Sequence, residues 1–150
     1  NSLRDTNMDL KIVFECSHDQ YVLMAMEPPK DWSSNLNCKI YSPEERTWKE
    51  RGNIIIGERN IQFETPVYYN GVVHFISDSG PYLTKGSSFY WPYIVAYDIQ
   101  NGSSRFLKIP KSARKGLNDQ SCKLGIFKWG NATNSFKSIC LIKLRKNVFS

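Results

Sequence analysis

The chain has 150 residues, a formal net charge of +6 and a pI near 9.2. That length suits one domain with a shared hydrophobic core, and we expect residues 1–150 to form it. No apolar run is long enough to span a membrane and no signal-peptide pattern opens the chain, so we expect a domain without a membrane partner.

The balance of aliphatic residues favours strands. The sequence holds 13 Ile and 7 Val against 4 Ala, and branched side chains suit a pleated surface and lose freedom in a helix. No segment sustains helical periodicity, so we predict an all-β fold in which helix occupies less than about a tenth of the chain.

Strand candidates in chain order are residues 9–15, 20–26, 39–41, 47–51, 61–69, 72–77 and 139–144, and residues 94–110 form a candidate hairpin. Residues 31–37 are predicted to be a loop in which Trp32 either packs on a sheet or lies exposed at its rim. Residues 53–57 include three consecutive Ile, a run that suggests burial on both faces or a loop anchored in the core.

Two Asn-Gly pairs indicate consecutive β-hairpins, Asn70-Gly71 and Asn101-Gly102, because two-residue hairpin turns need positive φ. A related plan repeats around two tyrosines separated by about 56 residues, Tyr41 and Tyr97, near the period of propeller blades. Each tyrosine precedes a polar turn and an aromatic residue on the return strand, Trp48 or Phe106. We predict that these two aromatics are largely buried at equivalent places.

The connection over residues 78–92 is long for a β domain, and such connections tend to be functional or disordered. It carries Tyr82, Phe89, Tyr90 and Trp91, residue types that anchor protein interfaces. Alternatively, residues 89–91 begin the next strand and pack between sheets. We favour packing for Phe89 and the surface for Tyr82, and we take Trp32, Tyr82, Tyr90 and Trp91 as candidate partner-binding residues.

The cysteines indicate a reducing compartment. The four cysteines are Cys16, Cys38, Cys122 and Cys140. They lie far apart, with no Cys-x-x-Cys spacing, and most occupy apolar runs, so we expect reduced core thiols rather than disulfides or a zinc site. The acceptor triplets at Asn101 and Asn131 are explained by turns. We therefore expect a cytoplasmic or nuclear protein.

Basic residues gather between Lys108 and Lys115 and again between Lys143 and Lys146. No nucleic-acid motif accompanies them, and such residues more often form a solvated face, so nucleic-acid binding is not expected. Enzyme signatures are also lacking: there is no nucleophile elbow, metalloprotease motif or phosphate-binding loop. His74 is interpreted as a structural histidine. We expect no catalysis, no cofactor and no metal site.

Several short motifs, in order, resemble the F-box-associated domain of plant F-box proteins: Tyr41-Ser42 with Trp48, Asn70-Gly71 with Val72, His74 and Phe75, and Ala96-Tyr97-Asp98-Ile99 with Phe106 and Ile109-Pro110. The similarity covers roughly residues 10–145. It implies antiparallel sheets arranged as about three blades of a kelch-like β-propeller, an incomplete ring.

The resemblance also implies a function. In that family the domain presents a target protein to a cullin-type ubiquitin ligase, and an F-box docks on the ligase adaptor. This sequence contains no leucine-rich F-box segment, so we expect target binding but not adaptor docking from the chain itself. The alternative is a glycan- or other ligand-binding β-domain, unconnected with ubiquitination, that stacks its ligand on exposed aromatics.

Overall fold

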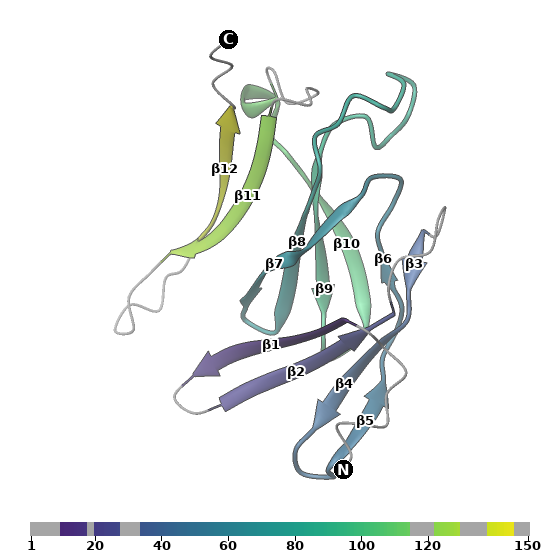
Figure 1. Ribbon diagram of the computed structural model, residues 1–150, viewed down its shortest axis with the longest axis vertical. Helices are drawn as coiled ribbons and strands as arrows, with labels where there is room; N and C mark the ends of the chain where they lie inside the picture. Colours follow the sequence, from purple (N-terminus) through teal and green to yellow (C-terminus); the bar gives the residue numbers. More distant parts are fainter. Residues whose placement is uncertain (1–9, 18–19, 28–33, 115–121, 130–137, 146–150) are drawn as a thin grey trace.

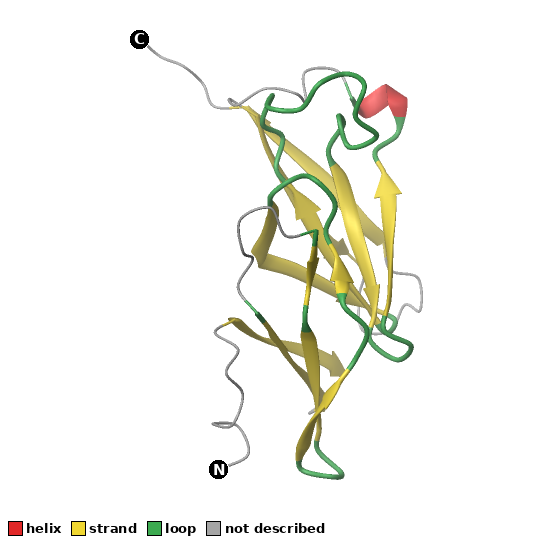
Figure 2. Ribbon diagram, turned by 90° about the vertical axis from the view of Figure 1, so that its right-hand side faces the viewer, coloured by secondary structure: helices red, strands yellow, loops and turns green. Residues whose placement is uncertain are grey.

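A computed structural model describes residues 10–17, 20–27, 34–114, 122–129 and 138–145 of the chain. These residues form twelve strands: β1 (Leu10–Ser17), β2 (Gln20–Met26), β3 (Asn35–Leu36), β4 (Cys38–Ser42), β5 (Thr47–Glu50), β6 (Ile54–Ile55), β7 (Ile61–Tyr69), β8 (Val72–Ser77), β9 (Tyr93–Asp98), β10 (Ser103–Lys108), β11 (Cys122–Trp129) and β12 (Ser138–Arg145). The predicted all-β class is confirmed (Figures 1 and 2).

Helix is confined, within the described ranges, to one 3-10 turn, η2 (Lys111–Ala113). Figure 2 shows it at the end of β10. No helix in this part of the chain has the length and apolar character needed to cross a bilayer.

Two four-stranded antiparallel sheets make up most of the fold, in the orders β1-β2-β4-β5 and β10-β9-β8-β7. The remaining strands pair as β11-β12 and β3-β6. About three blades were predicted, and the third set of strands is a two-stranded hairpin in the described residues. The sheets do not close into a ring (Figure 1).

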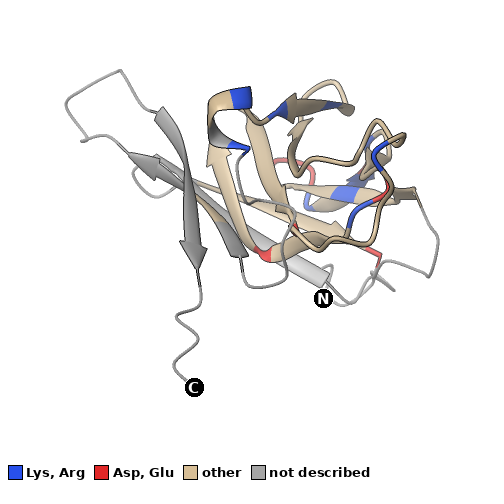
Figure 3. Cartoon of the chain, turned by 90° about the horizontal axis from the view of Figure 1, so that it is seen from above, with Lys and Arg blue, Asp and Glu red and all other residues tan. Residues whose placement is uncertain are grey.

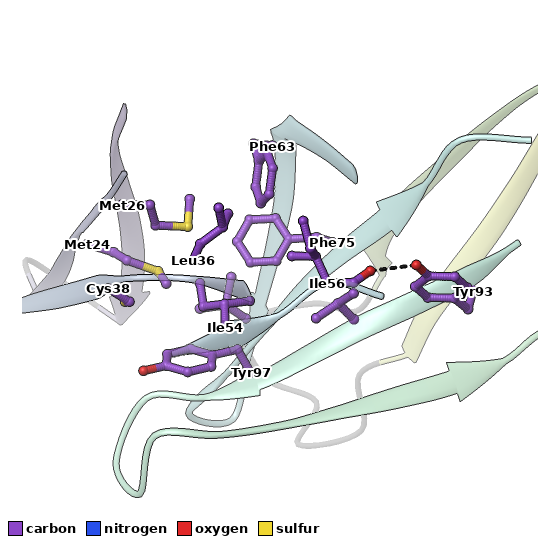
Figure 4. Close-up of a cluster of buried hydrophobic side chains, with 12 residues drawn as sticks. Met24, Met26, Leu36, Cys38, Ile54, Ile56, Phe63, Phe75, Tyr93 and Tyr97 are labelled. Atoms are coloured by element: carbon purple, nitrogen blue, oxygen red, sulfur yellow. Dashed lines mark hydrogen bonds between the residues drawn. The ribbon is translucent and has the colours of Figure 1, made fainter. Parts of the chain in front are cut away.

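The main core lies between the two four-stranded sheets. Met24, Cys38 and Ile54 meet Phe75 and Tyr97 there, each with 2% of its surface exposed or less (Figure 4). Tyr93 donates a hydrogen bond to the carbonyl of Ile56 at 2.5 Å. Because the Tyr93 hydroxyl is buried, its pKa is raised to about 12. Apolar contact between the sheets is therefore reinforced by buried tyrosine hydroxyls that have acceptors.

A second cluster covers the opposite face of the β7–β10 sheet, where Val67, Ile76 and Ile109 pack with Ile126 of β11. All residues from Val73 to Ser77 are buried in β8, because alternate side chains point to opposite faces and both faces are covered. Three layers follow one another: the β1-β2-β4-β5 sheet, the β7–β10 sheet and the β11-β12 hairpin.

The first Asn-Gly hairpin has the predicted bounds, with β7 ending at Tyr69 and β8 beginning at Val72. Asn70 and Gly71 both have positive φ, 51° and 79°, as the primed two-residue turn requires. β7 lies at the edge of its sheet, where Pro66 is tolerated beside an irregularity in the ladder.

The hairpins of the two tyrosines share one geometry. Ser42 pairs with Thr47 and Asp98 pairs with Ser103, so each turn has four residues, and each turn ends in a residue of positive φ, Arg46 or Gly102. The second Asn-Gly pair was wrongly predicted as a two-residue turn. Asn101 keeps negative φ and instead accepts hydrogen bonds from Ser103.

The predicted equivalence of the two aromatic residues on these return strands was wrong. Trp48 and Phe106 are both partly buried, but Trp48 lies opposite Tyr41 whereas Ser104 lies opposite Tyr97. Trp48 packs on Tyr41, while Phe106 packs on Phe89 and Tyr93.

Three shorter features differ from, or refine, the sequence-based expectations. Asn35–Leu36, expected to be loop, pairs with Ile54–Ile55. The three consecutive Ile alternate: Ile54 and Ile56 are buried and Ile55 is exposed. Cys38 is a free buried thiol whose pKa burial raises to about 11, as expected of a reduced core cysteine. The side chains of Cys16, Cys122 and Cys140 lie outside the described residues.

Candidate functional site

The connection between β8 and β9, residues 78–92, is built around one buried cation. Arg59 is 1% exposed and lies in the turn between β6 and β7. Its guanidinium donates to the carbonyls of Phe89 at 2.9 Å and Gly80 at 2.8 Å, and to that of Tyr90. Carbonyls from both ends of the connection thus converge on one planar fork of donors.

The charge of Arg59 is balanced by Asp78. Nη1 of Arg59 lies 3.3 Å from Oδ1 of Asp78, and the carboxylate also accepts from the hydroxyl of Tyr82 at 2.7 Å. The backbone N–H of Arg59 donates to the hydroxyl of Tyr93 at 3.1 Å. A buried charge is tolerated when it is paired and its donors are satisfied, and both conditions hold here.

Tyr82 lies on the outside of this network. Its side chain is 49% exposed, one face of its ring lies 5.3 Å from the guanidinium carbon of Arg59, and its hydroxyl accepts from the N–H of Asn60 at 2.9 Å. Burial of the hydroxyl raises the pKa of Tyr82; the bond from Asn60 opposes this shift and the bond to Asp78 adds to it. The ring is therefore held in one orientation while about half of it faces solvent.

Trp91 and Tyr90 are more buried than Tyr82. Their rings meet edge-on with centroids 5.0 Å apart, and Trp91 packs against the second hydrophobic cluster. The guanidinium carbon of Arg114 lies 5.8 Å from the Trp91 ring, and Nε of Arg114 donates to the carbonyl of Ile109. Phe89 packs on the main core against Tyr93 and Phe106, as predicted.

These contacts join three segments at one end of the molecule: residues 57–60, 78–92 and 109–114, called the rim below. Ser87 donates to Glu58 across it at 2.7 Å. Figures 1 and 2 show the β8–β9 connection and η2 at the same end, and Figure 3 shows the Lys and Arg residues in blue with the molecule seen from above. Three predicted candidates, Tyr82, Tyr90 and Trp91, lie on the rim, and Trp32 lies outside the described residues.

Arg59 was missed by sequence analysis. It stands in a Gly-Glu-Arg-Asn stretch that is typical of an exposed turn, and its partners lie 19 to 31 residues further along the chain. The useful signal would have been indirect: a long connection without regular structure needs buried polar partners if it is to be ordered.

Other chemistry is sparse in the described residues. No three His, Cys, Asp or Glu side chains there gather to hold a metal ion. His74 is 5% exposed and its Nδ1 lies 3.2 Å from the carbonyl of Val67, in keeping with the structural role predicted for it. No protein-family model, curated protein or solved structure matches this chain.

Proposed function

We propose that this chain is a non-catalytic protein-binding domain, made of blades of a kelch-like β-propeller, that selects targets for a cullin-type ubiquitin ligase. The protein-binding role is supported by the ordered rim. There the buried Arg59 holds the 78–92 connection in place, and this connection presents the half-exposed Tyr82. The ligase part comes from the resemblance to the F-box-associated domain.

The propeller part is supported by the repeat. The two four-stranded sheets have matching strand orders, and in each the last two strands are joined by a four-residue turn that ends in positive φ. They pack face to face through one core, as neighbouring blades do. The β11-β12 hairpin, which packs against β7 and β8, takes the place of a third blade.

The recognition part is supported by the preorganisation of the rim. A loop that is already ordered loses little conformational entropy on binding, so more of its contact energy is realised as affinity. Aromatic side chains on such a loop are the usual anchors of protein interfaces. In this proposal the partner is a target protein in the cytoplasm or nucleus, and an F-box, absent from this sequence, would dock on the ligase adaptor.

The test replaces Tyr82 by Ala and identifies the proteins that the purified chain captures from plant extract, by quantitative mass spectrometry. Tyr21→Ala is the matched control, because Tyr21 is 55% exposed on β2, away from the rim. We expect a captured protein whose affinity falls by about 1–4 kcal/mol with Tyr82→Ala and is unchanged with Tyr21→Ala. Trp91 is less suitable because it also packs on a core cluster.

Thermal melts of the same variants show that loss of binding is not loss of folding. A protein captured equally by both variants would contradict a recognition role for the rim. A glycan array probed with the same three proteins tests the alternative: a glycan whose binding depends on Tyr82, with no captured protein that does, would contradict the protein-binding proposal. Ubiquitination of the captured target in cells that express an F-box-bearing form would test the ligase part.

A further inference from the structure

We infer that the rim binds an acidic segment of its partner polypeptide. This inference rests on the proposed function and adds the chemistry of the partner. The rim carries a surplus of cations around its aromatic side chains, and its own carboxylates are already engaged.

The lysines on the rim and directly beside it are accessible and have no anionic partner in the described residues. Lys85 in the β8–β9 connection and Lys111 in η2 are exposed, as is Lys108, which directly precedes the rim, whereas Arg114 is half-buried and bonded to the carbonyl of Ile109. The ion pairs recorded among the described residues are Lys49–Glu45 and Arg59–Asp78, so no rim lysine has an anionic partner there. Positive charge of this kind attracts anionic partners and speeds their association.

The carboxylates of the rim do not offset these cations. Asp78 is paired with the buried Arg59 and accepts a hydrogen bond from the hydroxyl of Tyr82, so its charge is neutralised within the rim. Glu58 accepts from Ser87 and is the one other carboxylate in residues 57–60, 78–92 and 109–114. Within these ranges Lys85, Lys111 and Arg114 therefore outnumber the one carboxylate that has no cationic partner, and Lys108 directly beside the rim adds to the positive charge.

The aromatic rings favour a peptide over a nucleic acid. One face of Tyr82 is covered by Arg59, one face of Trp91 by Arg114, and the edge of Trp91 meets Tyr90. Single-stranded nucleic acids bind on rows of open rings on which successive bases stack, and these rings are not open in that way. A guanidinium on one face of each ring leaves at most the other face for a partner, and an apolar side chain of a peptide can pack there while its acidic residues pair with the lysines.

The experiment measures binding of labelled peptides to the purified chain by fluorescence anisotropy. The probes are a short peptide of Glu and Asp around a central Leu, its Gln and Asn counterpart, a version with phosphoserine in place of the acids, and an oligothymidine of equal length. We expect the two anionic peptides to bind and the neutral one not to bind. Their affinity should fall as salt is raised from about 0.05 M to about 0.5 M, because the screening length becomes shorter.

The decisive variants reverse the same amount of charge in two places. Lys85→Glu with Lys111→Glu alters the rim, and Lys49→Glu with Arg105→Glu alters β5 and β10. We expect the rim variant to lose about tenfold or more in affinity and the control to stay within about twofold. Circular dichroism melts confirm that both variants fold.

Equal loss in the two variants would overturn the inference, because net charge rather than the rim would then bind the peptide. Tighter binding of oligothymidine than of either peptide would overturn it in favour of a nucleic acid. The carboxylate and phosphoserine probes separate the two sources of acidity. If no peptide binds while the Tyr82-dependent target is still captured, the inference fails and the proposed function stands.

Discussion

His74 sits in the middle strand of three that bury it, opposite Val67 of β7 and Ala96 of β9. Burial lowers the pKa of this imidazole from its ordinary value of 6.5, although the carbonyl of Val67 favours the protonated form, and Arg105 lowers the pKa further. The neutral ring is thus the form that this sheet accommodates.

A stability-versus-pH measurement tests this environment. Because the folded-state pKa is depressed, the unfolded chain binds the proton more readily, and the contribution of His74 is lost as pH falls below 6.5. We expect unfolding free energy to fall between pH about 6.5 and about 5, above the range in which most carboxylates titrate. His74→Gln should flatten that slope. A slope unchanged in His74→Gln would contradict the burial argument.

The β8–β9 connection gains its order from a single side chain of another element. Arg59 precedes β7, and the carbonyls that it bonds lie at the two ends of the 78–92 connection. Deleting one partner of a buried charged network leaves the others unsatisfied. The shape of the rim therefore depends on a residue that is itself inaccessible to any partner.

Replacing Arg59 by Met keeps the length of the side chain and removes its donors. We expect a loss of about 3–5 kcal/mol in unfolding free energy, together with faster amide hydrogen exchange in residues 78–92 than in β8 or β9. Urea unfolding and hydrogen exchange by mass spectrometry measure both. Arg105→Met, an exposed arginine on β10, should change stability by less than about 0.5 kcal/mol. Equal effects at the two sites would refute the role of Arg59.

The elements that sequence analysis found are those whose signal is local. Residues 61–77 hold two runs of strand-forming residues separated by Asn70-Gly71, so the bounds of both strands at the turn and the turn geometry were predictable. Strand β3 was missed because its two residues pair with β6 across a separate segment. Strand β11 was missed although its partner β12 was predicted, because Gly125 and two lysines interrupt the apolar residues of this strand, and its strand character shows through its pairing.

Site residues divide in the same way. Tyr82, Tyr90 and Trp91 could be named because aromatic residues in a long connection are visible in the sequence. Arg59 could not, because its burial follows from where carbonyls of a distant loop come to lie. Register also escaped prediction: Phe106 lies opposite Val95, two residues beyond the position that matches Trp48.

At the scale of the whole molecule, the two four-stranded sheets meet where the segment after β5 passes the β9–β10 turn. The hydroxyl of Tyr97 donates to the carbonyl of Gly52 at 2.7 Å, and the N–H of Ile55 donates to the hydroxyl of Ser104 at 3.1 Å. Gly52 and Gly102 approach so closely that their backbones are in contact. The sheets are thus joined by backbone contact as well as by the shared core.

Adding a methyl group at this junction should push the sheets apart. A Cβ on Gly52 would lie 2.2 Å from the carbonyl oxygen of Gly102, which is backbone and cannot rotate away, so we expect Gly52→Ala to lower the unfolding free energy by about 1–3 kcal/mol. Gly86→Ala is the control, because nothing lies within 4 Å of its added methyl group. Tyr97→Phe removes the hydroxyl with its bonds to Gly52 and to the Cys38 thiol, adds no clash, and should lose only about 0.5–1.5 kcal/mol. Urea unfolding of the three variants measures the order; Gly52→Ala as stable as Gly86→Ala would mean that the core alone holds the sheets together.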